Sequence, residues 1–188
     1  MVASLAESVE LRFADGPDPV WTPAVLAALR GSPIRASFFV IAPQAAAHPE
    51  LVAAARAAGH AIELHCYEHV RHTESDRATI ERDTERALVV LAGMGVRPRR
   101  WSTPWGLHAP WTREVAAKYG LELCGWDIDT HDWRGDRAER MLAEMGPELC
   151  HGAVVMLHDG LGPGALRNGC EETVRFARML AAEAAAAA

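Results

Sequence analysis

Apolar runs alternate along the chain with stretches whose apolar residues recur at helical spacing. Residues 36–41 form an apolar run of the kind found in a strand that is buried on both of its faces. Other short runs, bounded by glycine and proline, predict further strands. The predicted strands cover residues 9–13, 36–41, 60–64, 99–102, 121–126 and 153–157. Six strands, each followed by a helical pattern, indicate an α/β protein.

Residues that favour helix starts and stops mark the segments between these strands. Thr22 is expected to cap a helix in which Pro23 takes the first position, while Gly59 and Gly93 are expected to end two others. The predicted helices cover residues 22–29, 49–58, 110–119, 136–145 and 171–183, and a longer helix is expected to begin at a cap within residues 73–76 and to end at Gly93 and Gly95. The alanine tail at residues 184–188 is expected to fray.

The alternation predicts a parallel sheet with right-handed crossovers, in a single domain that covers residues 1–188. An open dinucleotide-binding sheet is the alternative, but no Gly-x-Gly-x-x-Gly follows the first strand. Residues able to do chemistry follow the ends of several predicted strands: Asp15, His65, Trp105, Asp132 and His158. Because α/β barrels gather their sites at the carboxyl ends of strands, this placement favours a barrel.

Composition narrows the classes of partner. The net charge of −6 argues against a protein that binds a nucleic-acid backbone, which needs a basic face. No apolar run reaches the length of a membrane span, and residues 1–7 lack the basic and apolar regions of a signal peptide. The four cysteines form no Cys-x-x-Cys pair, so we expect reduced thiols in a cytoplasmic protein. No pattern in the sequence indicates an oligomeric state.

Three residues form a candidate metal site. His65 and His69 are four apart, and on one helical turn that spacing brings both imidazoles to the same side. Asp15 lies far upstream, where the first strand ends at a Gly-Pro turn. Two imidazoles and one carboxylate make an open, catalytic type of site that accepts Zn²⁺, Co²⁺ or Ni²⁺.

Five stretches, in this order, resemble the motifs of one enzyme family: residues 13–19, 65–69, 101–106, 126–133 and 156–160. The family is the polysaccharide deacetylases, which form carbohydrate esterase family four and share the NodB-homology domain. The resemblance covers nearly the whole chain, from Val9 to His158. It implies an irregular (β/α) barrel with fewer than eight parallel strands, which agrees with six visible strands.

The resemblance also implies roles for the metal site and its surroundings. Asp15, His65 and His69 correspond to the family's ligands for one divalent ion, most often Zn²⁺. Cys66 replaces the usual Ser or Thr between the two histidines, a hydroxyl that normally tethers the loop. Trp105 corresponds to the aromatic residue whose backbone N–H donates to the oxyanion of the tetrahedral intermediate.

The last two motifs supply an acid and an acyl pocket. His158 corresponds to the general acid, and Asp132 to the carboxylate that orients its imidazole. A carboxylate beside an imidazole raises the imidazole's pKa toward the protonated form that an acid needs. Trp126 and Met156 correspond to apolar walls around the acyl group.

Two positions depart from the family pattern. Ala14 stands where the family has the aspartate that acts as general base, and a methyl group accepts no proton. Ser102 stands where the family has the arginine that partners that aspartate. Arg99 and Arg100 are close in sequence, but strand alternation points them elsewhere. Either Ala14 is an engineered change, or the chain has drifted toward another base, such as Glu63 or His131, or toward binding without turnover.

We therefore expect a metal-dependent hydrolase that removes an N-acetyl group from an amino sugar, and we expect this chain to be impaired by Ala14. A small N-acylated glycoside or biosynthetic intermediate is the expected substrate, because the chain carries no added carbohydrate-binding module. Two alternatives remain open. One is a non-catalytic binding protein of the same fold, and the other is an amidohydrolase that acts on a cyclic amide.

Overall fold

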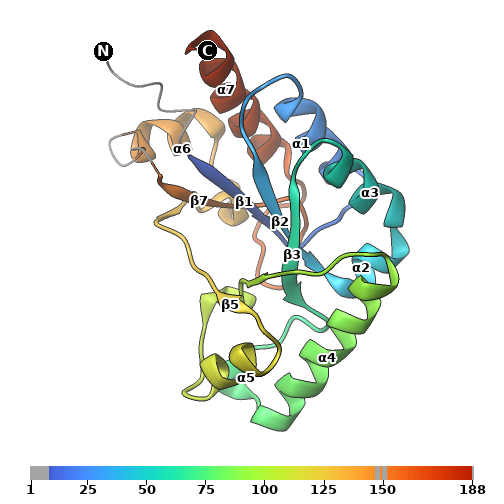
Figure 1. The fold of residues 1–188 in the computed structure, drawn as a ribbon. Helices are drawn as coiled ribbons and strands as arrows, with labels where there is room; N and C mark the ends of the chain where they lie inside the picture. Colours follow the sequence, from blue (N-terminus) through green and yellow to red (C-terminus); the bar gives the residue numbers. More distant parts are fainter. Residues whose placement is uncertain (1–8, 147–148, 150–151, 188) are drawn as a thin grey trace.

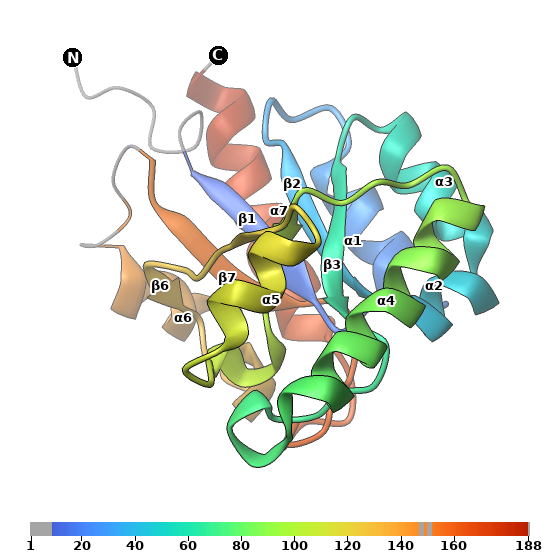
Figure 2. The same ribbon diagram turned by 60° about the horizontal axis from the view of Figure 1, so that its bottom comes forward.

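A computed structural model describes residues 9–146, 149 and 152–187. Within these residues seven parallel strands form one sheet that curls into an open half-barrel (Figures 1 and 2), so the predicted fold class is confirmed. The strand order is β5-β4-β3-β2-β1-β7-β6. The strands are β1 (Glu10–Ala14), β2 (Ala36–Ile41), β3 (Ala61–Cys66), β4 (Arg100–Trp101), β5 (Glu122–Leu123), β6 (Ile128–Asp129) and β7 (Val154–His158).

Helices pack on the outside of the curved sheet (Figure 1). α1 packs against α7, α2 against α4, and α6 against α7. Three short 3-10 turns lie at the carboxyl ends of strands. The helices are α1 (Trp21–Leu29), α2 (Ala42–Ala47), α3 (Pro49–Ala57), α4 (Arg77–Gly93), α5 (Thr112–Lys118), α6 (Ala138–Met145) and α7 (Glu171–Ala187), and the turns are η2 (His72–Glu74), η3 (Pro104–Gly106) and η4 (Asp132–Arg134). None of the described helices is both long and apolar enough to cross a membrane.

The two faces of the sheet differ in chemistry because successive side chains of a strand point to opposite sides. On the face toward the helices, the alternate residues of the strands are large and apolar. They belong to one core cluster that includes Leu11, Phe13, Phe38, Val40, Ile62, Leu64, Trp101, Val155 and Leu157. The opposite face, inside the half-barrel, carries the residues between them, and these are mostly polar.

Inside the half-barrel, below the carboxyl ends of the strands, lies an ionic layer made of Glu10, Arg12, Ser37, Glu63 and Arg100. The Arg12 guanidinium pairs with Glu10 at 3.1 Å, and the Arg100 guanidinium pairs with Glu63 at 3.1 Å and with Glu10 at 2.5 Å. Arg12 and Arg100 both lie beneath the ring of Phe39, 5.7 and 5.8 Å from its centre. These ion pairs give the buried charges of Arg12 and Glu63 partners of opposite sign.

The predicted strand at 121–126 is wrong in its extent. β5 ends at Leu123, and after Cys124 donates to the Trp101 carbonyl the chain leaves this edge of the sheet. From Asp127 it pairs with β7 on the opposite edge, and it forms β6, which the sequence analysis did not predict. The apolar run therefore spans a crossing between the two edge strands, and the count of strands rises from six to seven.

Several predicted element boundaries also differ. Thr22 is not the cap of α1, because the Oδ1 atom of Asp18 accepts from the N–H groups of Val20 and Trp21. Thr22 instead donates to the Asp159 carboxylate at 2.5 Å. α2 was not predicted, and α7 continues through Ala187 rather than fraying at 184. Residues 1–7, Cys150 and Ala188 lie outside the described residues.

Candidate active site

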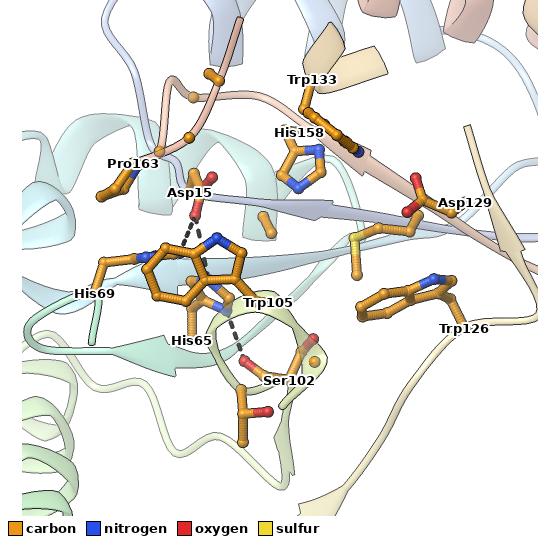
Figure 3. A pocket seen from close by; sticks show the side chains of 18 of the residues that line it. Asp15, His65, His69, Ser102, Trp105, Trp126, Asp129, Trp133, His158 and Pro163 are labelled. Carbon is orange, nitrogen blue, oxygen red and sulfur yellow. Dashed lines mark hydrogen bonds and ion pairs between the residues drawn. The ribbon is translucent and has the colours of Figure 1, made fainter. Parts of the chain in front are cut away.

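Asp15, His65 and His69 come together at the carboxyl end of β1 and β3. The Nε2 atoms of both histidines lie 3.2 Å from Oδ1 of Asp15 (Figure 3). The expected helical turn is absent, because His65 belongs to β3 and His69 lies in the loop that follows it. Asp15 reaches the histidines because it takes a left-handed backbone conformation, with a φ of 70°, just after β1.

The hydrogen bonds of this cluster fit a bound cation. His65 Nδ1 lies 2.6 Å from the Ser102 carbonyl oxygen, which can only accept, so Nδ1 carries the proton and Nε2 presents a lone pair to Asp15. Oδ1 of Asp15 is buried and has no hydrogen-bond donor within the described part of the chain. Facing acceptor atoms of this kind are what a divalent ion requires.

Ala14 lies directly beside this cluster. It is the last residue of β1, it is buried, and its methyl group lines the same cavity as Asp15. With Phe39 and Met156 it forms a small apolar patch against which Trp126 packs. The position where the family carries a carboxylate is therefore an apolar part of the cavity floor.

His158 also lines this cavity, and Asp132, which is buried and does not line it, holds the His158 ring. His158 Nδ1 lies 2.8 Å from Oδ1 of Asp132, and the backbone N–H of His158 donates to Oδ2 at 2.9 Å. Burial raises the pKa of Asp132, but His158, Arg167 and Thr173 bring it down to about 2. Burial lowers the pKa of His158, and the Asp132 carboxylate raises it above its ordinary value. The pair thus consists of a fixed carboxylate and an imidazole that readily holds a proton.

Arg167 and Thr173 hold this pair in place, and the sequence analysis missed both. Arg167 donates to Oδ2 of Asp132 at 3.0 Å and to the His158 carbonyl at 2.9 Å, and its side chain is nearly buried. Thr173, in the first turn of α7, donates to the same carboxylate oxygen at 2.6 Å. Neither residue stands in a motif or at a strand end, so no local pattern marks them.

Aromatic side chains and glycine backbone form the walls of a cavity of about 420 Å³. Trp105 packs edge-on against His69, with ring centres 4.3 Å apart, and Trp126 lies so close to Gly106 that a Cβ there would be 2.5 Å from the indole. Trp133 and Asp129 also line the cavity (Figure 3). Both lie inside the stretch 126–133, of which only Trp126 was predicted, together with Met156, to form a wall of the acyl pocket.

The loop between β7 and α7, residues 159–170, covers the cation cluster from the other side. A Cβ on Gly160 would overlap the Asp15 carbonyl oxygen, and a Cβ on Gly162 would overlap Oδ2 of Asp15. Further along the loop, Gly164 faces the indole nitrogen of Trp105. The absence of side chains at these positions lets the loop backbone lie directly on the Asp15 ligand.

The alternative bases lie elsewhere. Glu63 is bound by the backbone N–H groups of Arg99 and Arg100 and by the Arg100 guanidinium, all within the ionic layer. His131 lies at the start of η4, and neither it nor Glu63 lines the cavity. Arg100 points into the ionic layer, as strand alternation predicts, and Ser102 lines the cavity with a buried hydroxyl oxygen that has no hydrogen-bond partner among the described residues.

Sequence comparison finds related proteins over most of the chain. A family model described as polysaccharide deacetylase matches residues 3–124. A chitooligosaccharide deacetylase of Bradyrhizobium sp. (strain ANU 289) is 34% identical over 173 residues, which are 89% of this chain and 78% of that protein.

Solved structures share the fold. A family 4 carbohydrate esterase from Streptomyces lividans, solved in complex with acetate, aligns with a TM-score of 0.84 and 30% identity, over 95% of this chain and 88% of that one. BA3943 of Bacillus anthracis, a pseudoenzyme of the CE4 family, aligns with a TM-score of 0.81 over 93% of this chain and 59% of that one. At 16% identity, the second likeness shows the fold alone.

Proposed function

Because the chain belongs to the polysaccharide deacetylase family, we propose that it is a cation-dependent hydrolase that removes the acetyl group from an N-acetylated amino sugar. The observation that carries the proposal is that the Asp15–His65–His69 cluster and His158, whose ring Asp132 holds, face the same cavity. One cluster binds a cation beside the amide, and the other supplies a proton to the leaving amine. Amide hydrolysis needs both functions.

The substrate that we propose is a small glycoside rather than a long polymer. The related chitooligosaccharide deacetylase acts, by its name, on short chains of N-acetylated sugar. A cavity of about 420 Å³ with aromatic walls is in the size range of small-molecule sites. Action in the cytoplasm is part of the proposal, and fractionation of cells that express the natural protein tests it.

The residues of the cavity divide the reaction among them. A divalent cation on Asp15, His65 and His69, with Zn²⁺ the leading candidate and Co²⁺ or Ni²⁺ as alternatives, would polarise the amide carbonyl and acidify a water molecule. We assign Trp126 and Met156 to the wall around the acetyl group, and the backbone N–H of Trp105 to the oxyanion. Nδ1 of His158 is committed to Asp132, so Nε2 is the atom that protonates the leaving nitrogen.

The Ala14 side chain makes this chain a slow enzyme in our proposal. Among the described residues that line the cavity, the only carboxylates are Asp15, which faces the two histidines, and Asp129. A committed ligand cannot also serve as a base. General-base catalysis typically contributes about 10²–10⁴-fold, so its loss lowers kcat by that order.

Replacement of Ala14 by aspartate tests this proposal. Ala14→Asp should raise kcat by roughly 10²–10⁴-fold on an N-acetylated chitooligosaccharide, with little change in KM, because a base acts in the transition state. Ala14→Asn is the matched control, since it has the same size without a carboxylate, and it should give no gain. A rate for Ala14→Asp within a few-fold of the present chain would place the base elsewhere.

A non-catalytic sugar-binding protein is the second candidate, and the apolar Ala14 is the observation that favours it. Under that reading the present chain binds N-acetylated oligosaccharides by calorimetry, and neither it nor Ala14→Asp releases acetate. Cyclic ureides and imides belong in the same substrate panel. Release of a ring-opened product from these compounds alone would assign a different hydrolase.

A further inference from the structure

Two residues that line the cavity can accept a proton and are not part of the cation cluster. The titratable and charged residues that line it, in the described chain, are Asp15, His65, His69, Arg71, Asp129, His158 and Arg167. Arginine is always protonated, and the first three form the cation cluster. Asp129 and His158 therefore remain as proton acceptors.

His158 stands next to the missing carboxylate. Ala14 and His158 are directly opposed in the pairing of β1 with β7, so their side chains point to the same face of the sheet. The imidazole points into the cavity between Asp15 and Trp133 (Figure 3). Because the methyl group of Ala14 is short, no side chain at that position separates the imidazole from the cation cluster.

The hydrogen bonds of His158 leave the right atom free. In the neutral ring, Nδ1 keeps its proton toward Oδ1 of Asp132 at 2.8 Å, and Nε2 presents a lone pair to the cavity. Asp132 is held by Arg167 at 3.0 Å and by Thr173 at 2.6 Å, so the ring cannot turn without breaking this network. An imidazole that is oriented by a buried carboxylate is a general base of the kind found in hydrolytic triads.

Asp129 is less well placed than His158. It lies on β6, which is separated from β1 by β7, and its partner across the strands is Met156 rather than His158. One of its carboxylate oxygens accepts the N–H of His131 at 2.8 Å. In Figure 3 the Asp129 side chain lies farther from Asp15 than the His158 ring does, away from the cation cluster.

We propose that His158 acts in this chain as both general base and general acid, an inference that rests on the deacetylase function proposed above. Nε2 takes a proton from water while the water oxygen bonds to the carbonyl carbon and the carbonyl π electrons move to oxygen. The same proton then passes from Nε2 to the amide nitrogen as the carbon–nitrogen bond breaks. The products are acetic acid and the neutral amine, which at neutral pH become acetate and the protonated amine by transfer of the acid's proton, and Asp132 remains ionised throughout.

An activated ester separates the two roles of His158. The 4-nitrophenolate of 4-nitrophenyl acetate leaves without a proton, so its release needs a base but no acid. In the present chain, His158→Gln should lower ester hydrolysis by roughly 10²–10⁴-fold, because the base is lost. In the Ala14→Asp background, the same substitution should leave ester hydrolysis within a few-fold and lower only the hydrolysis of the N-acetyl sugar, because the introduced carboxylate then supplies the base.

Two further variants complete the design. His131→Gln removes a histidine outside the cavity and should change neither activity. Asp129→Asn tests the rival acceptor. Circular dichroism and Zn²⁺ affinity of His158→Gln, measured by calorimetry, should match those of the present chain and so exclude misfolding.

The inference is overturned if ester hydrolysis by the present chain survives His158→Gln, or if it disappears in Asp129→Asn while His158→Gln retains it. It is also overturned if the present chain is inert toward both substrates while Ala14→Asp is active. Failure of the proposed function looks different. In that case no variant releases acetate from N-acetyl sugars, whatever the ester assay shows.

Discussion

The hydrogen bond from His65 Nδ1 to the Ser102 carbonyl decides which nitrogen of His65 faces Asp15. It holds the ring in one tautomer and one orientation before any cation binds, which is how outer partners of a metal site act. The bond uses the backbone of Ser102 and not its side chain. The cation cluster is therefore independent of the arginine that the family carries at this position.

Loss of one histidine should remove tight cation binding. His65→Ala should weaken Zn²⁺ affinity by more than the roughly 10–100-fold that the loss of an outer partner costs, because a direct ligand disappears. The present chain should bind one ion with all three ligands. His131→Ala is the control and should bind as the present chain does. Calorimetric titration of the chelator-treated proteins measures the Zn²⁺ affinity and the number of ions bound. Equal affinities for the present chain, His65→Ala and His131→Ala would refute the assigned site.

The charge of Asp132 should set the pH range of the acid. Burial lowers the pKa of His158 and Asp132 raises it above its ordinary value, so Asp132→Asn should lower it. In the active Ala14→Asp background, where His158 must be protonated, the alkaline limb of the kcat profile should then move to lower pH, and kcat should fall more than KM changes.

The control for this experiment is Asp136→Asn. Asp136 is a nearby carboxylate whose partners, Arg134 and Arg140, lie outside the cavity. It should leave the profile in place. If the alkaline limb of Asp132→Asn coincides with that of the parent, the pair does not set the acid's pKa.

At the scale of elements, the β7–α7 loop is part of the cation site although it supplies no ligand. Gly162→Ala should weaken Zn²⁺ binding, because the new methyl group would overlap Oδ2 of Asp15 and must push the carboxylate or the loop away. Gly125→Ala is the matched control, since nothing lies within 4 Å of its Cβ position. Zn²⁺ titrations and thermal unfolding of both variants measure this effect, and equal affinities would show that the loop is free to move.

A buried histidine joins η2 to β4 and α5 and should make stability depend on pH. Burial, with the nearby His108 and His65, lowers the pKa of His72 to about 4, and the ring lies against Trp101 and within reach of the Thr112 hydroxyl. Its pKa is lower in the folded chain than in the unfolded chain. The stabilising contribution is therefore present above about pH 6.5 and is lost as the pH falls toward 4.

His72→Gln should remove that dependence. Between about pH 6.5 and 4, the present chain should lose on the order of 2–3 kcal/mol more unfolding free energy than the variant does. Urea unfolding of both proteins with chelator present measures the difference, since protonation of the cation ligands is then common to both. Parallel curves would show that His72 titrates alike in the folded and unfolded chains.

Periodicity predicted the elements that have a long apolar face or clear start and stop residues. β2 matches its predicted residues, and α4 begins where the side chain of Asp76 accepts from the Thr79 N–H. Periodicity failed at residues 121–126, because this apolar run contains both the end of β5 and the start of the segment that crosses the open side of the half-barrel to β6. α2 was missed because its short alanine-rich stretch has too few large side chains to show a helical period.

The site was predictable where its residues follow strand ends within a motif. Asp15, His65 and His69 do meet, but the sequence could not show that a strand end and a loop, rather than a helical turn, bring the two histidines together. The contacts of Arg167 and Thr173 with Asp132 could not be predicted from the sequence, for a different reason. They touch Asp132 only because the β7–α7 loop folds back over β7, and tertiary contacts of that kind leave no local pattern.

On the scale of the whole molecule, the residues that stabilise the half-barrel lie apart from the residues that line the cavity. The apolar core lies between the sheet and the helices, and the ionic layer closes the interior below the cavity. Ala14 ends β1 two residues after Arg12, Ser102 follows β4 two residues after Arg100, and neither takes part in the ion pairs of the layer. A change at either position therefore leaves no buried charge without a partner.

The ionic layer limits which substitutions such a chain can accept during evolution. Its charged members constrain one another, because the buried charges of Arg12 and Glu63 are satisfied by Glu10 and Arg100, so loss of either partner leaves a buried charge unpaired. The two positions above them are under no such constraint from the rest of the fold. The layer below keeps its ion pairs whichever residues stand at 14 and 102, because neither Ala14 nor Ser102 contacts them. Exchange of residues at positions 14 and 102 is thus expected to alter the chemistry of the cavity in a protein that stays folded.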